Sequence, residues 1–255
     1  MRETKLVNTR HGNMFIYSND PTIGKSLEHY GEYCYPEIEL LLPFLNSESF
    51  VIDIGANIGT HTVALAPHVS RLVAFEPDPE NLDLLQKNCA MQDSKVAKRI
   101  SVNPFALSNE QLMVSTQFDY GKTKIVPGGD IVTVPLDDIK GFPRIDLIKI
   151  DVEGMEYNVL LGAKNTLMYF RPILFIEMQD ASMNSLVFDF LDSLGYNMFW
   201  APCATYNPNN HKGNTEDIFG KQHGVLNWLC TPYQVSTGLV PVTDRTDTIE
   251  KAVLR

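Results

Sequence analysis

Carboxylates lie at the ends of two apolar segments of the sequence, one just inside a predicted strand of a parallel sheet and one just past the next strand. The segment "FVIDIGANIGTHT", residues 50–62, carries Asp53 and then breaks into a glycine turn. A second apolar segment ends in Glu76 and Pro77. Glu76 follows Gly55 by about twenty residues, the spacing at which a carboxylate reaches the ribose hydroxyls of a nucleotide. The pattern therefore predicts an adenosine-like ligand at this edge of the sheet.

The glycines of the turn are spaced as G-x-x-x-G and not as G-x-G-x-x-G. The second spacing lets the backbone approach a pyrophosphate at a helix N-terminus. S-adenosylmethionine has no phosphate, and its sulfonium and ammonium cations suit acids at strand ends. We therefore expect S-adenosylmethionine, with an NAD-dependent oxidoreductase as the alternative. A purely structural turn would explain Gly55 and Gly59 equally well, and Glu76 favours ligand binding.

A third group of acids lies in "KIDVEGME", where Asp151, Glu153 and Glu156 are close together, and Glu177 ends the next apolar segment. Carboxylates at such spacing repel one another unless they face a cation, a metal or a proton to be moved. We expect Asp151 and Glu153 to provide a general base, because like-charge crowding raises the pKa of one of them. Helix capping is the structural alternative.

Other candidates for the base are Glu177, His61 in the helix after the glycine turn, and His223 in a late polar loop. A lone histidine more often packs or caps a helix, so His61 ranks behind the acids. Asp151 and Glu177 also suit Mg²⁺, which would acidify an acceptor hydroxyl. We rank a site without a metal ahead of this one.

Apolar strand-like segments alternate with helical patterns from residue 50 onward. This alternation predicts an α/β fold with a mostly parallel sheet and helices on both faces, in which ligands bind at the carboxyl ends of the strands. The rhythm changes at "QLMVSTQFD" and "DIVTVPLDDI", which predict an antiparallel hairpin joined by a stretch rich in Gly, Lys and Pro.

The composition excludes several classes of partner. The chain has 255 residues, with 21 basic and 31 acidic residues and a net charge of −10, so we expect no binding to nucleic acid or to an anionic membrane. The four cysteines form no C-x-x-C pair, which argues against a zinc site or a disulfide framework. We expect a cytoplasmic protein, and the sequence does not indicate an oligomeric state.

Several segments, taken in order, resemble the FkbM family of S-adenosylmethionine-dependent methyltransferases. They are "FVIDIGANIGTHTVALA", "VAFEPDPENLDLLQKN", "FALS", "VTVPLDDI", "IDLIKIDVEGMEYNVLLGA" and "RPILFIEM". The D-x-G-A-N-x-G, F-E-P-x-P and D-V-E-G blocks are specific in combination. The resemblance implies a Rossmann-like class I methyltransferase fold, with a seven-stranded, mostly parallel sheet and an antiparallel edge hairpin. It also implies O-methylation of a hydroxyl on a sugar, a glycan or another small natural product.

By this resemblance, the glycine turn lines the methionine part of the cofactor, Glu76 holds the ribose, and Phe105 and Ala106 lie near the adenine. Asp151 and Glu153 face the reacting end. The predicted cofactor-binding residues are Asp53, Gly55, Ala56, Asn57, Gly59, Glu76, Pro77, Phe105, Ala106 and Asp151. The predicted catalytic residues are Asp151, Glu153 and His61. A cofactor-binding protein without catalysis is a further alternative.

We divide the chain into an N-terminal extension (1–48), a methyltransferase domain (49–233) and a C-terminal tail (234–255). The loop over 203–220 is rich in Asn, Gly and Pro. Loops of this length in compact domains are often functional. We therefore expect this loop and residues 30–35 to form a lid over the acceptor.

Overall fold

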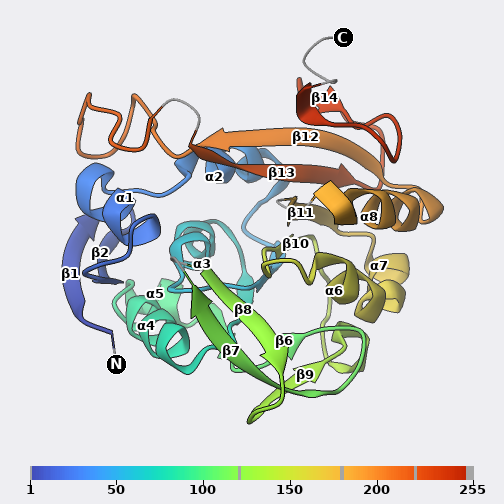
Figure 1. Ribbon diagram of the computed structural model, residues 1–255, viewed down its shortest axis with the longest axis horizontal. Helices are drawn as coiled ribbons and strands as arrows, with labels where there is room; N and C mark the ends of the chain where they lie inside the picture. Colours follow the sequence, from blue (N-terminus) through green and yellow to red (C-terminus); the bar gives the residue numbers. More distant parts are fainter. Residues whose placement is uncertain (1, 120–121, 179–180, 221–222, 251–255) are drawn as a thin grey trace.

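One large mixed sheet forms the centre of the computed structural model, which describes residues 2–119, 122–178, 181–220 and 223–250. Its strands are β3 (Phe50–Ile54), β4 (Arg71–Phe75), β5 (Ile100–Asn103), β10 (Leu147–Ile150), β11 (Ile173–Glu177), β12 (Asn197–Ala204), β13 (Gly224–Thr231) and β14 (Val240–Pro241). Their order is β14-β12-β13-β11-β10-β3-β4-β5 (Figure 1). The strands from β11 to β5 run parallel, whereas β13 is antiparallel to both of its neighbours.

This arrangement confirms the predicted α/β class with a mostly parallel sheet and an antiparallel hairpin, β12–β13, towards one edge. The sheet differs from the seven-stranded expectation by the two-residue strand β14 beyond β12. β14 lies in the part of the chain predicted to be a C-terminal tail, whose residues 251–255 lie outside the described residues. The tail therefore contributes to the sheet edge.

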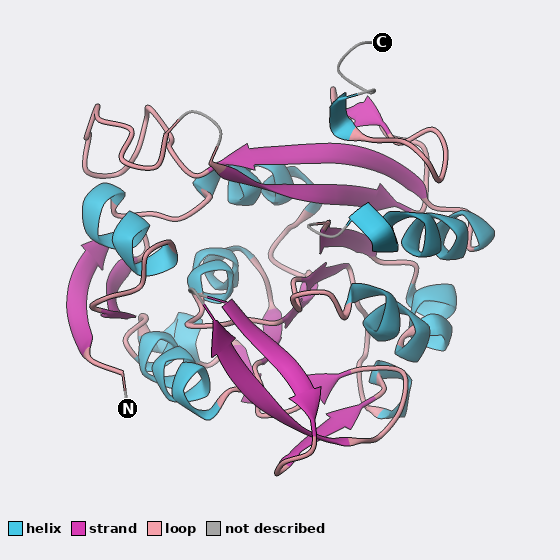
Figure 2. Ribbon diagram, in the orientation of Figure 1, coloured by secondary structure: helices cyan, strands magenta, loops and turns pink. Residues whose placement is uncertain are grey.

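Helices cover both faces of the sheet (Figure 2). They are α2 (Tyr35–Leu41), α3 (Thr60–Leu65), α4 (Pro79–Ala90), α5 (Ser94–Ala97), α6 (Glu156–Gly162), α7 (Lys164–Phe170) and α8 (Ala181–Ser193), with short 3₁₀ turns η1 (Leu42–Phe44), η2 (Ala66–His68) and η3 (Leu136–Asp138). Alternate residues of β3 point to opposite faces, so Val51 packs with α2, α3 and α4 while Ile52 packs with α6, α7 and α8. None of the described helices is both long and apolar enough to cross a membrane.

A second, smaller sheet contains β6 (Ala106–Leu107), β7 (Met113–Asp119), β8 (Lys122–Pro127) and β9 (Ile131–Val134), in the order β6-β9-β7-β8. The two β-rich segments predicted to pair do so, with Met113 opposite Val132 in an antiparallel ladder. The stretch predicted to be only their connection forms β8, which pairs with β7 along its whole length. The predicted hairpin is therefore part of a three-stranded antiparallel unit in which β7 lies between β8 and β9.

The N-terminal residues pack against the large sheet's helical layer. They form the hairpin β1 (Thr4–Thr9) and β2 (Gly12–Tyr17), followed by α1 (Ile23–Tyr30). Asn88 of α4 holds β2 in place, because its side-chain amide accepts from the backbone nitrogen of Phe15 at 2.7 Å and donates to the carbonyl of Phe15 at 3.0 Å. The segment is thus fixed beside the first helices of the α/β core.

Candidate active site

A cavity of about 510 Å³ opens at the carboxyl ends of β3, β4, β10 and β11. The predicted residues that line it are Gly55, Ala56, Asn57, His61, Glu76, Pro77, Asp151, Glu153, Glu177 and His223. The predicted residues that do not line it are Asp53, Gly59, Phe105 and Ala106. The tertiary structure therefore brings most of the candidates from four separate strand ends to one place.

The glycine turn after β3 requires its glycines for steric reasons. Gly55 has a φ of +77°, and a Cβ atom there would lie 1.8 Å from the carbonyl oxygen of Asp151. Gly59 has a φ of +93°, and its Cβ would lie 2.7 Å from the side chain of Leu85 in α4. The structural interpretation of the two glycines thus holds. Gly55 also faces the cavity, so the close approach of the two strand ends shapes the site.

Glu76 is held at the end of β4 by the backbone. Its two carboxylate oxygens accept hydrogen bonds from the backbone nitrogens of Asn57 at 2.8 Å and Asp78 at 2.9 Å. Burial raises the pKa of Glu76 from 4.5 to about 7, although both backbone hydrogen bonds oppose the rise. The side chain is 4% exposed and lines the cavity. It is therefore oriented by the main chain and keeps further lone pairs for a ligand.

Lys149 is a site residue that the sequence analysis missed. It lies opposite Asp53 in the β3–β10 register, and its Nζ is 3.5 Å from Asp53 Oδ1 and 3.2 Å from Asp151 Oδ2. Asp53 is fully buried and also accepts from Thr62 Oγ1 at 2.6 Å. Asp53 therefore braces the site from behind the cavity. The visible signal was a lysine in the otherwise apolar strand "LIKI".

The acids near Asp151 are less mutually repulsive than their spacing indicated. Burial acts to raise the pKa of Asp151, but Lys149 and a hydrogen bond with Glu177 outweigh it and hold that pKa below its ordinary value. Burial likewise opposes the charge of Lys149, but Asp151 and Asp53 hold the pKa of Lys149 above its ordinary value. The rise in pKa expected for one member of the Asp151–Glu153 pair therefore does not occur at Asp151, because Lys149 supplies a cation beside its carboxylate.

Three carboxylates at the cavity could hold a divalent cation. One oxygen from each of Asp151, Glu153 and Glu177 lies within 4.8 Å of the others. Carboxylate oxygens suit Mg²⁺, which prefers hard ligands. Lys149 already neutralises part of this charge. The three carboxylates therefore have the right chemistry for Mg²⁺, but Asp151 already has Lys149 as its counter-ion.

His61 is tied to a glutamate that lies far from it in the sequence. Its Nε2 is 2.7 Å from Oε2 of Glu37 in α2, and Glu37 Oε1 accepts from Asn227 Nδ2 of β13 at 2.8 Å. All three side chains are buried, and His61 lines the cavity. His223 also lines it, where its Nδ1 lies 2.9 Å from Thr205 Oγ1. No local pattern in the sequence indicated that Glu37 belongs to the site.

The smaller sheet supplies a wall that the sequence did not indicate. Thr116 of β7 and Thr123 and Ile125 of β8 line the cavity. The β7–β8 hairpin lies in front of the large sheet in Figure 1. These residues reach the site only through the placement of the hairpin, so their types and spacing gave no signal.

The polar loop after β12 lies against the N-terminal segment, as Figure 1 shows beside α1. Glu32, which is 3% exposed, accepts hydrogen bonds from Asn207 Nδ2 at 2.7 Å and from the backbone nitrogen of His211 at 2.9 Å. The hydroxyl of Tyr30 accepts from the backbone nitrogen of Ile218 at 2.9 Å. The two segments predicted to form a lid are therefore hydrogen-bonded to each other.

The strand order and the site at the strand ends define a class I methyltransferase fold. A solved structure described as methyltransferase FkbM from Methylobacillus flagellatus superposes on 72% of this chain and 44% of its own, with a TM-score of 0.52 and 21% identity. Residues 53–198 match the model of the methyltransferase FkbM domain. The chain therefore belongs to the FkbM methyltransferase family.

Two curated relatives show similarity over part of their length. Hexuronic acid methyltransferase AglP of Haloferax volcanii is 30% identical over 141 residues, which cover 51% of this chain and 56% of the relative. Methyltransferase sdnD of Sordaria araneosa is 27% identical over 177 residues, which cover 53% of this chain and 66% of the relative. The chain thus matches between about half and two thirds of these relatives.

Proposed function

We propose that this protein transfers the methyl group of S-adenosylmethionine to a hydroxyl of a sugar, a glycan or another small natural product. The observation that carries the proposal is the cavity lined by Glu76 after β4, His61 in α3, and Asp151 and Glu153 after β10. Its volume of about 510 Å³ lies in the range of small-molecule sites. The relative named as a hexuronic acid methyltransferase supports a sugar acceptor.

The residues present fit the cofactor. Glu76 can accept hydrogen bonds from the two ribose hydroxyls, since the backbone takes only one lone pair from each of its oxygens. Asp151 and Glu153 suit the cationic methionine end. Phe105, which is 39% exposed, and Ala106 do not line the cavity, so their contact with adenine stays a prediction.

The contribution of the chain to methyl transfer is chiefly orientation. When bound, the cofactor supplies a methyl group activated by a positively charged sulfur. Holding an acceptor in line with such a group can lower the free-energy barrier of the reaction by about 7–11 kcal/mol. A hydroxyl acceptor also needs a group that takes its proton. The lid formed by the 203–220 loop and residues 30–35 would exclude water while this happens.

A metal-assisted version of the same reaction would use Asp151, Glu153 and Glu177 as ligands. We place it second, because Lys149 is the resident counter-ion of Asp151. Assays after dialysis against EDTA, and after Mg²⁺ is restored, separate the two versions. Full activity in the chelated protein would eliminate the metal, whereas recovery only with Mg²⁺ would establish it.

Calorimetric titration with S-adenosylmethionine, S-adenosylhomocysteine and NAD tests the proposal. Binding of the first two alone supports it and justifies an acceptor screen of sugars and glycans, which suit a chain of net charge −10 better than nucleic acid does. Binding of NAD alone would favour an oxidoreductase. A protein that binds the cofactor but turns over no acceptor, and whose cofactor affinity is the same in the Asp151→Asn and Glu153→Gln variants, would be a binding protein without catalysis.

A further inference from the structure

Three buried polar side chains form a continuous chain that ends at the cavity. Asn227 donates to Glu37 Oε1 at 2.8 Å, and Glu37 Oε2 lies 2.7 Å from His61 Nε2. Asn227, Glu37 and His61 are 4%, 4% and 6% exposed. They come from β13, α2 and α3, so three separate elements of the fold hold the imidazole in one orientation.

We propose that His61 Nδ1 takes the proton of the acceptor hydroxyl and that Glu37, fixed by Asn227, positions His61 for this step. The inference rests on the proposed methyl transfer. A carboxylate accepts but does not donate, so the imidazole nitrogen that faces Glu37 must carry the proton. The second nitrogen, Nδ1, has no hydrogen-bond partner among the described residues and is left as the acceptor.

The position of His61 suits this role better than that of Asp151. His61 lies in the first turn of α3, directly after the glycine turn, and lines the same cavity as Glu76. Asp151 is held as an anion by Lys149, which makes it a weaker base. Glu37 of α2 contacts His61 directly, and Asp151 after β10 and His11 at the β1–β2 turn interact with it electrostatically.

The proposed step balances without a further reagent. The acceptor oxygen forms a bond to the methyl carbon as the carbon–sulfur bond breaks, and the bonding electron pair stays on sulfur. The hydroxyl proton passes to His61 Nδ1 and then to solvent. Glu37 stabilises the imidazolium that exists between these two events, because its carboxylate is 2.7 Å from Nε2.

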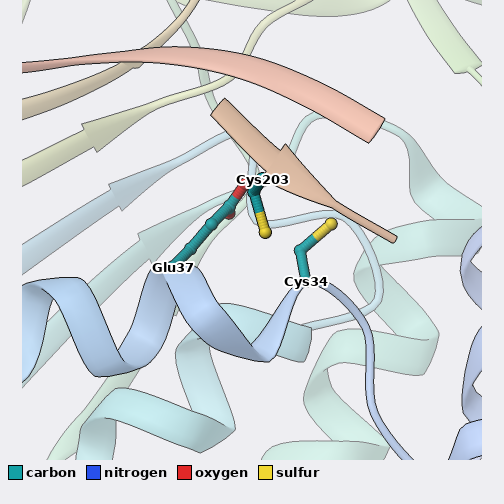
Figure 3. A group of neighbouring side chains, drawn as sticks. All are labelled: Cys34, Glu37 and Cys203. Carbon is teal, nitrogen blue, oxygen red and sulfur yellow. The ribbon is translucent and has the colours of Figure 1, made fainter. Parts of the chain in front are cut away.

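Two thiols beside Glu37 raise the question of a metal. Cys34 and Cys203 lie with Glu37 between α2 and β12, and one ligand atom of each residue is within 4.8 Å of the others (Figure 3). Both oxygens of Glu37 already accept hydrogen bonds. A hydrogen bond with Cys203, together with burial, raises the pKa of the Cys34 thiol well above its ordinary value, whereas metal ligation needs thiolates. The group therefore does not suit a metal, and the two cysteines pack beside Glu37.

The Glu37→Gln variant tests the positioning role. Asn227 donates, so it selects the oxygen of the new amide and turns the amide nitrogen towards His61. That nitrogen donates, which forces the proton of His61 from Nε2 to Nδ1 and removes the acceptor. We expect kcat to fall about 10²–10⁴-fold, while the Kd for S-adenosylmethionine and the acceptor KM change less than about threefold.

The second readout is the ¹⁵N NMR spectrum of the His61 ring in the protein without ligands. The proton should lie on Nε2 in the wild-type protein and on Nδ1 in the Glu37→Gln variant. Cys203→Ala is the matched control, since it changes a neighbour of Glu37 outside the hydrogen-bonded chain, and it should leave kcat and the ring spectrum unchanged.

Three results would overturn the inference. They are an unchanged His61 ring spectrum in Glu37→Gln, an unchanged kcat in that variant, and stoichiometric zinc in the wild-type protein that Cys203→Ala loses. Failure of the proposed function looks different, because the wild-type protein would then not bind S-adenosylmethionine. The ring spectra of the two proteins would still decide whether Glu37 positions His61.

Discussion

Replacing Glu76 with Gln should weaken S-adenosylmethionine binding by about two orders of magnitude. Each oxygen of Glu76 accepts one backbone hydrogen bond, from Asn57 or Asp78, and keeps a lone pair for a ribose hydroxyl. Glutamine has one oxygen, and its amide nitrogen would face a backbone N–H that also donates. A hydrogen bond to a charged group contributes about 1.5–3 kcal/mol. A loss of about 3 kcal/mol corresponds to roughly a hundredfold in Kd.

The same variant should remove a pH dependence. Burial raises the pKa of Glu76 to about 7, so a cofactor that binds the carboxylate should lose about tenfold in affinity for each pH unit below that value. Because this pKa is raised from 4.5, the stabilisation of the folded state is fully present below pH 4.5 and is lost as the pH rises through about 7. The change amounts to about 3 kcal/mol, and the variant should not show it.

Calorimetric titrations and urea unfolding at several values from pH 5 to pH 8 measure both effects. Glu80→Gln is a matched control, because Glu80 pairs with Arg2 outside the cavity. The control should bind the cofactor as the wild-type protein does. The proposed role of Glu76 is wrong if Glu76→Gln binds with wild-type affinity, or if its affinity and stability follow the same pH profile as those of the wild-type protein.

Three further substitutions or deletions test the frame around the site. Gly55→Ala should lower the free energy of unfolding in urea by about 3 kcal/mol or more, since its Cβ would lie 1.8 Å from the Asp151 carbonyl oxygen. Gly154→Ala is the control: its Cβ would meet no atom within 4 Å, and the variant should lose only about 1 kcal/mol. Lys149→Met should cost about 3–5 kcal/mol in the same assay, because it leaves the fully buried Asp53 and the partly exposed Asp151 without their cation. Deletion of 206–214 should reduce acceptor turnover but leave cofactor binding intact in calorimetry, and loss of both would contradict the lid.

The local patterns of the chain were sufficient for the fold class, and most of the residues that they singled out for the site line the cavity. Apolar segments closed by Gly55, Glu76 and Asp151 predicted parallel strands whose ends carry the chemistry, because strands buried on both faces need continuous apolar runs. The glycine turn could also be predicted from the sequence, since only glycine accepts the φ of +77° at Gly55 together with the close approach of a neighbouring strand. These features depend on residues close together in the sequence.

The partners of the charged groups were decided only by the tertiary structure. The sequence predicted acids that crowd one another, but the register of β3 and β10 places Lys149 against Asp53 and Asp151 and holds the pKa of Asp151 below its ordinary value. Likewise Glu37 meets His61 and Asn227 because α2 packs beside α3 and beneath β13. A pKa or a proton position depends on the few atoms within hydrogen-bond reach, and for these groups those atoms belong to distant parts of the chain.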